Sequence, residues 1–252
     1  AQNIAARNGR RDADYKFGTN PCSEIILRPY QFCNLSEVVV RADDTKETLL
    51  EKVVLATTLG TLQASMTDFR YLRNIWKRNT EEEALLGVSL TGIMDCKLTN
   101  GSTGYKELGS LLASLKEKAI ETNVKWAKKL KIGASTSITC VKPSGTVSQL
   151  TDSASGIHPR FSNYYIRTVR ADKKDPLATT MLEAGFPCEE DITNNSNWVF
   201  SFPQKAPKNA ITVDSMGALE QLELWKVYQD HWCEHKPSMT CYYNDDNFFS
   251  VC

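Results

Sequence analysis

The sequence lacks several signatures that would identify its class at once. It has eight cysteines but no Cys-x-x-Cys pair, so the strongest zinc or dithiol signature is missing. It has no run of about 18 apolar residues, and its first residues carry no signal-like apolar core. Thirty basic and thirty acidic residues cancel, which argues against a partner that is a nucleic acid or a membrane surface. We therefore expect a cytoplasmic protein whose cysteines are thiols.

What the sequence does contain is the composition of a globular interior. Of its 252 residues, 41% are hydrophobic and 24% are charged, which is enough to bury a sizeable core. There is no internal repeat or low-complexity stretch, and we expect residues 1–252 to form a single domain. Alternating strand-like and helix-like periodicities indicate an α/β fold. The expected helices span 48–69, 71–78, 105–130, 175–185 and 216–231, and the expected strands span 86–91, 136–142, 163–170, 197–202 and 238–243.

Residues 20–24, which read Asn-Pro-Cys-Ser-Glu, are the segment densest in reactive groups, and Cys33 follows eleven residues after Cys22. If this segment is extended, Asn20, Cys22 and Glu24 project from the same face. An amide can orient a hydroxyl, a carboxylate can take its proton and two sulfurs can exchange electrons, which suits redox chemistry on a polyol. Asn-Pro is also a common turn starter and a buried free cysteine an ordinary small hydrophobic residue, so spacing alone leaves a structural role open.

A second motif lies at residues 138–150, which read Ile-Thr-Cys-Val-Lys-Pro-Ser-Gly-Thr-Val-Ser-Gln-Leu. A strand that stops at the Pro-Ser-Gly-Thr segment and passes into a helix leaves several backbone N–H groups unpaired and pointing one way. Such a turn is a ready anion site, and phosphate fits it. An ordinary capped strand-to-helix turn has the same pattern.

A short cluster at residues 231–235, His-Trp-Cys-Glu-His, could offer His231 and His235 as metal ligands one helical turn apart. The cluster ends an amphipathic run, and the dipole of a helix favours histidine at its C-terminus without any metal. We therefore assign no metal site to the chain.

Together the two motifs resemble the catalytic subunits of ribonucleotide reductases. Asn-x-Cys-x-Glu with a second cysteine eleven residues on resembles the finger loop that carries the thiyl radical, and its flanks are most similar to the adenosylcobalamin-dependent (class II) branch. The Pro-Ser-Gly-Thr turn resembles the turn that binds the substrate's phosphates, and segments 87–92, 155–167 and 236–240 are also similar to the family. The resemblance implies the C-terminal half of a ten-stranded α/β barrel, with the finger loop at about residues 18–36.

The resemblance also implies a role for each motif residue. Cys22 would become the thiyl radical that abstracts the 3′ hydrogen, Glu24 would be the general base on the 3′ hydroxyl, and Asn20 would hold the ribose hydroxyls. Cys33 would be one of two thiols that deliver the reducing equivalents and form a disulfide. The candidates for holding the phosphates are Pro143, Ser144, Gly145, Thr146 and Ser148, with the charge of Lys142 as a weaker candidate.

The resemblance further implies partners. Subunits of the family are much longer than 252 residues and place the second reducing cysteine well before the finger loop. We therefore expect the N-terminal half of the reductase, or a second subunit, as a partner. Adenosylcobalamin would be the cofactor, an external dithiol such as thioredoxin the reductant, and a ribonucleoside di- or triphosphate the substrate.

Two alternatives remain open at this point. The chain could be a catalytically silent barrel fragment that acts as a structural or interaction partner. It could also be a class I type subunit that receives its radical from a metal-containing small subunit. The intact set of motif residues favours a catalytic role, because a silent fragment has no physical need for all of them.

Overall fold

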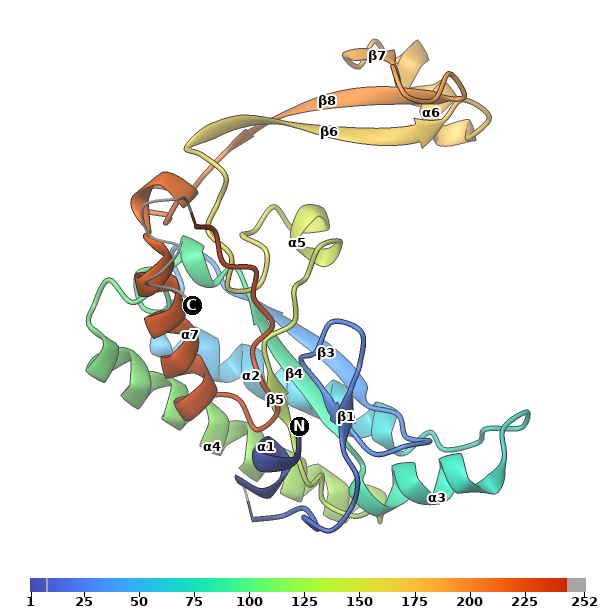
Figure 1. Cartoon of the computed structure of the whole chain (residues 1–252), viewed down its shortest axis with the longest axis vertical. Helices are drawn as coiled ribbons and strands as arrows, with labels where there is room; N and C mark the ends of the chain where they lie inside the picture. The colour runs from blue at the N-terminus through green and yellow to red at the C-terminus, as the bar shows by residue number, and fades with distance from the viewer. Residues whose placement is uncertain (8, 244–252) are drawn as a thin grey trace. The chain divides into compact units, whose positions relative to one another are not determined.

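The computed structural model describes residues 1–7 and 9–243 (Figure 1). Their contacts group them into two compact units, the first made of residues 1–160 together with the segment that begins at Lys208, and the second of residues 161–207. Both units lie within the range that we expected to form a single domain. The active-site candidates all lie in the first unit.

The first unit is built on a parallel sheet of strands β3 (Asn34–Val39), β4 (Leu86–Thr91) and β5 (Thr139–Cys140), in that order. All six residues of β4 are buried, as expected for the central strand of a parallel sheet that is covered on its faces. An isolated parallel bridge between Val141 and Pro237 brings a late segment of the chain beside the end of β5. A segment from late in the chain therefore lies beside the carboxyl end of β5.

Helices pack around this sheet, and α4 and α7 lie side by side in Figure 1. Leucines and valines from α2 and α4 share one core with β4, including Leu49, Val53, Leu112 and Val88. None of the helices in residues 1–7 and 9–243 is both long and apolar enough to cross a membrane. The helices of this unit are α1 (Gln2–Arg7), α2 (Lys46–Ala64), α3 (Asn74–Glu83), the 3-10 helix η1 (Ile93–Asp95), α4 (Tyr105–Leu130), α5 (Val147–Leu150), the 3-10 helix η2 (Val213–Ser215) and α7 (Ala218–His231).

A short antiparallel hairpin precedes the sheet. Its strands β1 (Gly18–Thr19) and β2 (Ile26–Leu27) pair Gly18 with Leu27 and Thr19 with Ile26. The hairpin occupies the range that we expected for the finger loop, and its tip runs from Asn20 to Ile25.

The second unit is an antiparallel sheet. Strands β6 (Tyr164–Asp172), β8 (Asn197–Lys205) and β7 (Cys188–Glu190) lie in the order β6-β8-β7. Helix α6 (Pro176–Glu183) is capped by Asp175, whose side chain accepts from Leu177 N. The side chain of Phe200 is 1% exposed and forms the centre of this small unit.

Most expected elements are confirmed. The expected helix over 105–130 matches α4, and the expected strands over 86–91, 163–170 and 197–202 match β4, β6 and β8 within a few residues. Helix α2 ends at Ala64 and not at residue 69 as expected. The backbone N–H of Ser65, which follows it, donates to carbonyls of the last helical turn. Strand β5 covers only two residues of the expected 136–142.

The strand expected over 238–243 does not form, so this prediction is wrong. Pairing beside β5 ends where Ser238 N donates to Val141 O at 2.8 Å. Beyond that point the segment after β5 offers no further backbone donor, because Lys142 N donates to a side-chain hydroxyl and Pro143 has no N–H. The chain from 239 onward therefore has no ladder to continue.

Residues 152–160 return from the predicted phosphate turn to the sheet and are held tightly there. Arg160 forms a buried ion pair with Asp95, with Nη2–Oδ2 at 2.9 Å. Gly156 N donates to Thr91 Oγ1 at 2.9 Å. Gly156 has φ of +55°, and a Cβ built on it would lie 2.4 Å from the carbonyl oxygen of Lys142. Only glycine therefore fits this contact behind the turn.

We expect Gly156→Ala to lower the free energy of unfolding by about 2–4 kcal/mol, since it combines left-handed strain with a backbone clash. Gly133→Ala is the matched control, because Gly133 lacks a positive φ and its nearest new contact would be 3.9 Å away. Urea unfolding of both variants measures the difference. Equal stabilities of the two variants would contradict the close packing inferred here.

Candidate active site

The tip of the hairpin is a tight turn, not an extended segment. Ser23 N donates to Asn20 O at 2.9 Å, and Asn20 N donates to Ile25 O at 3.2 Å. Ser23 has φ of +64°, a left-handed conformation that an extended strand does not contain. The prediction that Asn20, Cys22 and Glu24 project from one face of an extended segment is therefore wrong. The hydrogen bonds of the turn, which spacing cannot reveal, decide where each side chain points.

The turn sends Cys22 and Glu24 to opposite environments. Cys22 is exposed, whereas Glu24 is 0% exposed. Asn20 precedes both residues in the sequence, and its side chain stabilises the turn itself, because its Oδ1 accepts from Ile25 N at 3.1 Å. The Nδ2 group of Asn20 makes no hydrogen bond to any other described residue, so it is left to bind a ligand.

Glu24 is a buried carboxylate without hydrogen bonds. Neither of its oxygens has a hydrogen-bond partner among the residues that the structure describes. The nearest cation is Lys142, with Nζ 3.7 Å from Oε1. A carboxylate taken out of water with only one distant counter-charge is energetically costly. Such a group is typical of a base kept ready for a ligand rather than of a structural ion pair.

Two thiols lie near Glu24, the partly buried Cys33 and the fully buried Cys140. Burial raises the pKa of Cys33 well above its usual value, the charge of Arg11 opposes this and the charge of Glu24 adds to it. Cys140 on β5 is also buried, and burial together with Cys33, Glu24 and another thiol raises its pKa. Both side chains are therefore protonated thiols at neutral pH. The sequence carried no signal that would have brought Cys140 to the site, because only the sheet places it there.

The predicted phosphate turn opens outward and is anchored from behind. Gly145 and Thr146 are exposed, and a Cβ added to Gly145 would meet no atom within 4 Å. The hydroxyl of Ser155 donates to the carbonyls of Pro143 and Ser144. These contacts fix the backbone of the turn and leave its outer side free.

Two serines of this motif point inward. Ser144 is 3% exposed with φ of +54°, and Ser148 is 0% exposed. The hydroxyl of Ser148 accepts from Gln149 Nε2 at 3.1 Å. Helix α5 is a single turn, so its dipole adds little to anion binding. The outer groups of Gly145 and Thr146 are thus better placed for a phosphate than the hydroxyl of Ser148.

Lys142 connects the turn to the buried acids. It directly precedes the turn, pairs with Glu24 and also acts on Glu37 of β3. Burial raises the pKa of Glu37, while the Ser144 hydroxyl and the Lys142 charge oppose that rise. The Ser144 hydroxyl lies near Glu37 without reaching hydrogen-bond geometry, so both groups keep unused hydrogen-bonding capacity. Sequence reasoning named Lys142 only as a weak phosphate candidate and did not find Glu37.

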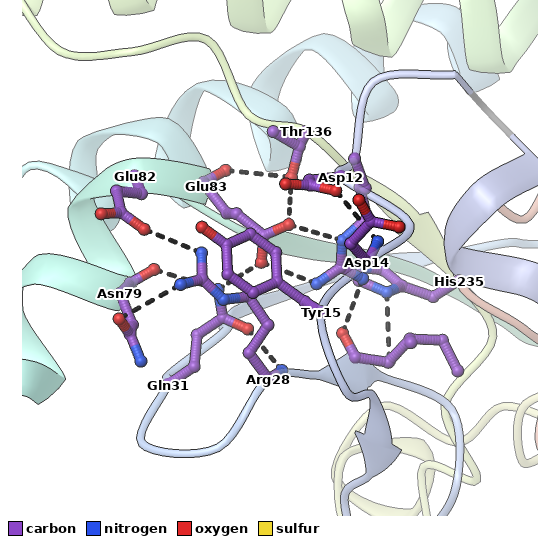
Figure 2. Close-up of polar contacts among 12 residues, drawn as sticks. Asp12, Asp14, Tyr15, Arg28, Gln31, Asn79, Glu82, Glu83, Thr136 and His235 are labelled. Carbon is purple, nitrogen blue, oxygen red and sulfur yellow. Dashed lines mark hydrogen bonds and ion pairs between the residues drawn. The ribbon is translucent and has the colours of Figure 1, made fainter. Parts of the chain in front are cut away.

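The base of the hairpin is held by a dense polar network, drawn in Figure 2. Arg11 and Glu83 form a bidentate ion pair in which both N···O distances are 2.7 Å. Arg11 also donates to Ile26 O at 2.9 Å, and Gln31 donates to the same Glu83 carboxylate. Arg28 pairs with Glu82 at the edge of this network. In contrast to Glu24, every oxygen of Glu83 is satisfied, so this network is structural.

His235 belongs to the same region and is fully buried. Its Nδ1 accepts from Ile26 N at 3.2 Å and its Nε2 donates to Leu86 O at 2.9 Å. Burial, with a smaller contribution from the charge of Arg11, lowers the pKa of His235 to about 3. The ring is therefore neutral, and both nitrogens are occupied. Within residues 1–7 and 9–243, no group of three or more His, Cys, Asp or Glu side chains is arranged to hold a metal ion.

Comparison with known proteins places this site in context. The sequence matches no protein-family profile. It is 32% identical over 243 residues to a probable adenosylcobalamin-dependent ribonucleoside-triphosphate reductase of Dictyostelium discoideum, a match that covers 91% of this chain and 30% of that protein. It is 28% identical over 257 residues to the adenosylcobalamin-dependent ribonucleoside-triphosphate reductase of Lactobacillus acidophilus, covering 91% of this chain and 34% of that protein. The chain thus spans about a third of the length of the curated relatives that it matches.

Solved structures agree with the sequence matches. The crystal structure of a B12-dependent (class II) ribonucleotide reductase aligns with a TM-score of 0.79 and 26% identity, over 95% of this chain and 37% of that one. The alpha subunit of the class Id ribonucleotide reductase of Actinobacillus ureae aligns with a TM-score of 0.57 and 16% identity, over 91% of this chain and 48% of that one, and shares the fold alone. The α/β fold class is therefore confirmed as that of the reductase barrel.

We expect Glu24→Met to raise the free energy of unfolding by about 1–3 kcal/mol, because it removes two buried oxygens that have no hydrogen-bond partner. Glu83→Met is the matched control and should lower it by about 3–5 kcal/mol, since it leaves Arg11 buried without its counter-charge. Chemical unfolding of both variants tests this contrast. A loss of stability in Glu24→Met would show that the carboxylate is structural.

We expect the buried state of His235 to make stability fall in acid. The unfolded chain takes up a proton on this ring below pH 6.5, whereas the folded chain does so only near pH 3. Between these values the free energy of unfolding should drop by about 1.4 kcal/mol per pH unit from this residue, and above pH 6.5 it should not change. The measurement is urea unfolding of the wild type and His235→Asn at pH 5 and pH 7.5. If the difference in free energy of unfolding between wild type and variant were the same at both pH values, the lowered pKa of His235 would be contradicted.

Proposed function

The chain is a relative of adenosylcobalamin-dependent ribonucleotide reductases that corresponds to about a third of their length, and from this we propose that it carries the radical hairpin and the substrate phosphate turn of such an enzyme. The observation that carries the proposal is the environment of Glu24. This carboxylate is buried and has no hydrogen bond among the described residues, it lies two positions after the exposed Cys22, and the Lys142 that pairs with it directly precedes the Pro143–Thr146 turn. Glu24, Cys22 and the turn would together supply the base, the thiol and the anion site that the reduction of a ribonucleotide requires.

The proposed substrate is a ribonucleoside di- or triphosphate. The exposed backbone of Gly145 and Thr146 would accept its phosphates, with the turn held rigid by Ser155 from behind. The free Nδ2 group of Asn20 would then donate to a ribose hydroxyl at the hairpin tip. Binding at the turn would bring the ribose toward Cys22 and Glu24.

The proposed reaction begins at Cys22. As a thiyl radical, this residue would take the hydrogen atom from C3′ of the ribose. Glu24 would accept the proton of the 3′ hydroxyl while the 2′ hydroxyl leaves as water. Because Glu24 has no hydrogen bond of its own, the 3′ hydroxyl would be its first partner. Cys22 would finally return the hydrogen atom to C3′.

Cys33 would be one of the two thiols that reduce the substrate. Together the two thiols give two electrons and two hydrogens, one of which replaces the lost hydroxyl while the other leaves in the water, and they become a disulfide. The second thiol would come from the remainder of the reductase. An external dithiol such as thioredoxin would reduce the disulfide after each turnover.

The position of Cys22 suits the proposed cofactor. When bound, adenosylcobalamin supplies the radical through homolysis of its cobalt–carbon bond. Cys22 is exposed at the tip of the hairpin, so no other described side chain covers its sulfur from such a group. Asn20 and Ser23 hold the turn that presents it.

The first unit also presents surfaces suited to the proposed partner, the N-terminal half of the reductase. Strand β3 is an edge strand with a single neighbour in the described sheet. Beside it, α2 exposes Leu55 by 70%, Leu59 by 55% and, just beyond its end, Met66 by 72%. An open strand edge beside an apolar helix face is typical of a surface that another chain segment covers. We propose that the remaining part of the barrel packs here.

The test is ribonucleotide reduction by this chain, alone and mixed with the N-terminal half of the reductase, in the presence of adenosylcobalamin, dithiothreitol and labelled cytidine di- or triphosphate. We expect product only in the mixture that contains the cobalamin. Cys22→Ser should abolish product while leaving nucleotide binding intact. Turnover by Cys22→Ser would contradict the radical assignment. No product in any mixture, with the two halves nonetheless associating, would point to a metal-containing subunit as the radical source or to a silent fragment.

We expect Gly145→Val to raise the Kd of the nucleotide by about ten-fold or more, because the added side chain occupies the outer side of the turn and blocks the backbone donors. The fold should not change, since the space around Gly145 is open and its φ is not positive. Gly133→Ala serves as the control for binding. Calorimetric titration with a cytidine triphosphate measures the difference, and an unchanged Kd would exclude this turn as the phosphate site.

A further inference from the structure

One edge of the hairpin is closed by a segment from the far end of the chain. Asn20 and Ile25 bond each other across the hairpin, so the carbonyl of Glu24 and the N–H of Ile26 face away from β1. Lys236 N donates to Glu24 O at 3.1 Å. His235 Nδ1 accepts from Ile26 N at 3.2 Å. The segment thus pairs with the hairpin as a third strand would, except that an imidazole ring replaces one backbone acceptor.

His235 is also tied to the sheet. Its backbone N–H donates to Thr139 O of β5 at 3.0 Å, so its own main chain faces the sheet and only its side chain is left for the hairpin. The ring then spans from Ile26 to Leu86 O at the start of β4. The neutral ring of His235 therefore connects β2 with β4, and the backbone of His235 is hydrogen-bonded to β5.

The contacts of Ile26 show how narrowly the hairpin is held. His235 binds its N–H, and Arg11 binds its carbonyl oxygen at 2.9 Å. Arg11 is in turn held by its bidentate ion pair with Glu83. Figure 2 shows the surrounding polar network, in which Glu83, Gln31 and His235 are labelled. Ile26 begins β2 and lies two residues after Glu24, so its position constrains the depth at which Glu24 is buried.

We propose that His235 is a positioning residue for the radical hairpin. Its ring sets the height of β2 above the sheet and thereby places Glu24 and Cys22 relative to the phosphate turn. The role of the hairpin in catalysis rests on the proposed function, whereas the way it is held does not. Displacing reacting groups by about 1 Å can reduce a rate about a hundred-fold, so one lost contact in this position matters.

The first test is amide hydrogen exchange in the full chain. His235→Leu removes both ring contacts, and we expect the amides of residues 20–26 to exchange about 10- to 100-fold faster while those of α4 do not change. His231→Asn is the matched control, because His231 lies at the exposed end of α7 and does not touch the hairpin. Unchanged exchange in the hairpin of a folded His235→Leu protein would overturn the proposal.

Two conservative variants keep the test decisive if His235→Leu does not fold. The amide oxygen of His235→Asn lies where Nδ1 was and can still accept from Ile26 N, whereas His235→Gln reaches toward Leu86 and loses that acceptor. We expect the hairpin amides to be better protected in His235→Asn than in His235→Gln. Equal or reversed protection would overturn the proposal.

The second test is kinetic and uses the reconstituted reductase. His235→Leu should lower kcat with little change in KM, because the phosphate turn keeps its own supports, and His235→Asn should restore part of kcat. A wild-type kcat in His235→Leu would overturn the positioning role. If the wild type shows no reductase activity but the exchange results are as expected, the proposed function fails and the inference about how the hairpin is held stands.

Discussion

The burial of the Glu24 carboxylate, 3.7 Å from Lys142 and without a hydrogen bond, is the feature that the surrounding structure has to support. A buried polar group without hydrogen bonds would draw its segment toward water if the segment were free to move. The hairpin is not free, because Lys236 binds the carbonyl of Glu24, and Arg11 and His235 bind the main chain of Ile26 two residues later. Backbone hydrogen bonds therefore keep the Glu24 side chain buried, although that side chain has no stabilising hydrogen bond of its own.

The surroundings of Glu83 and of Glu24 differ in how completely their polar atoms are hydrogen-bonded. Around Glu83 every donor and acceptor is matched, and such a network rigidifies the base of the hairpin. Around Glu24, Glu37 and Ser144 several buried oxygens have no partner among the described residues. Proteins commonly break the rules of polar satisfaction at functional sites and compensate elsewhere. The satisfied network and the unsatisfied one are adjacent because the first makes the second possible.

The same reasoning applies to the phosphate turn. Gly156 and Ser155 press against the carbonyls of residues 142–144 from inside, and Arg160 with Asp95 locks the segment that carries them. The outer side of the turn is left to Gly145 and Thr146. A rigid inner support with an open outer surface is suited to binding an anion without rearrangement. Lys142 pairs with Glu24 and directly precedes this turn, so its charge lies next to both the proposed base and the proposed phosphate site.

Sequence by itself determined the composition of the site and much of the fold. The long helix at 105–130, the buried strand at 86–91 and the two motifs follow from local periodicity and residue type, which act over a few positions. Tertiary structure alone decided that the hairpin tip is a turn, that Glu24 is buried while Cys22 is exposed, and that Ser148 points inward. It also placed His235 in contact with Ile26, a residue 209 positions away in the sequence. Residues 238–243 form no strand, because no neighbouring strand pairs with them. These outcomes depend on contacts between residues far apart in the chain, and no local pattern encodes them.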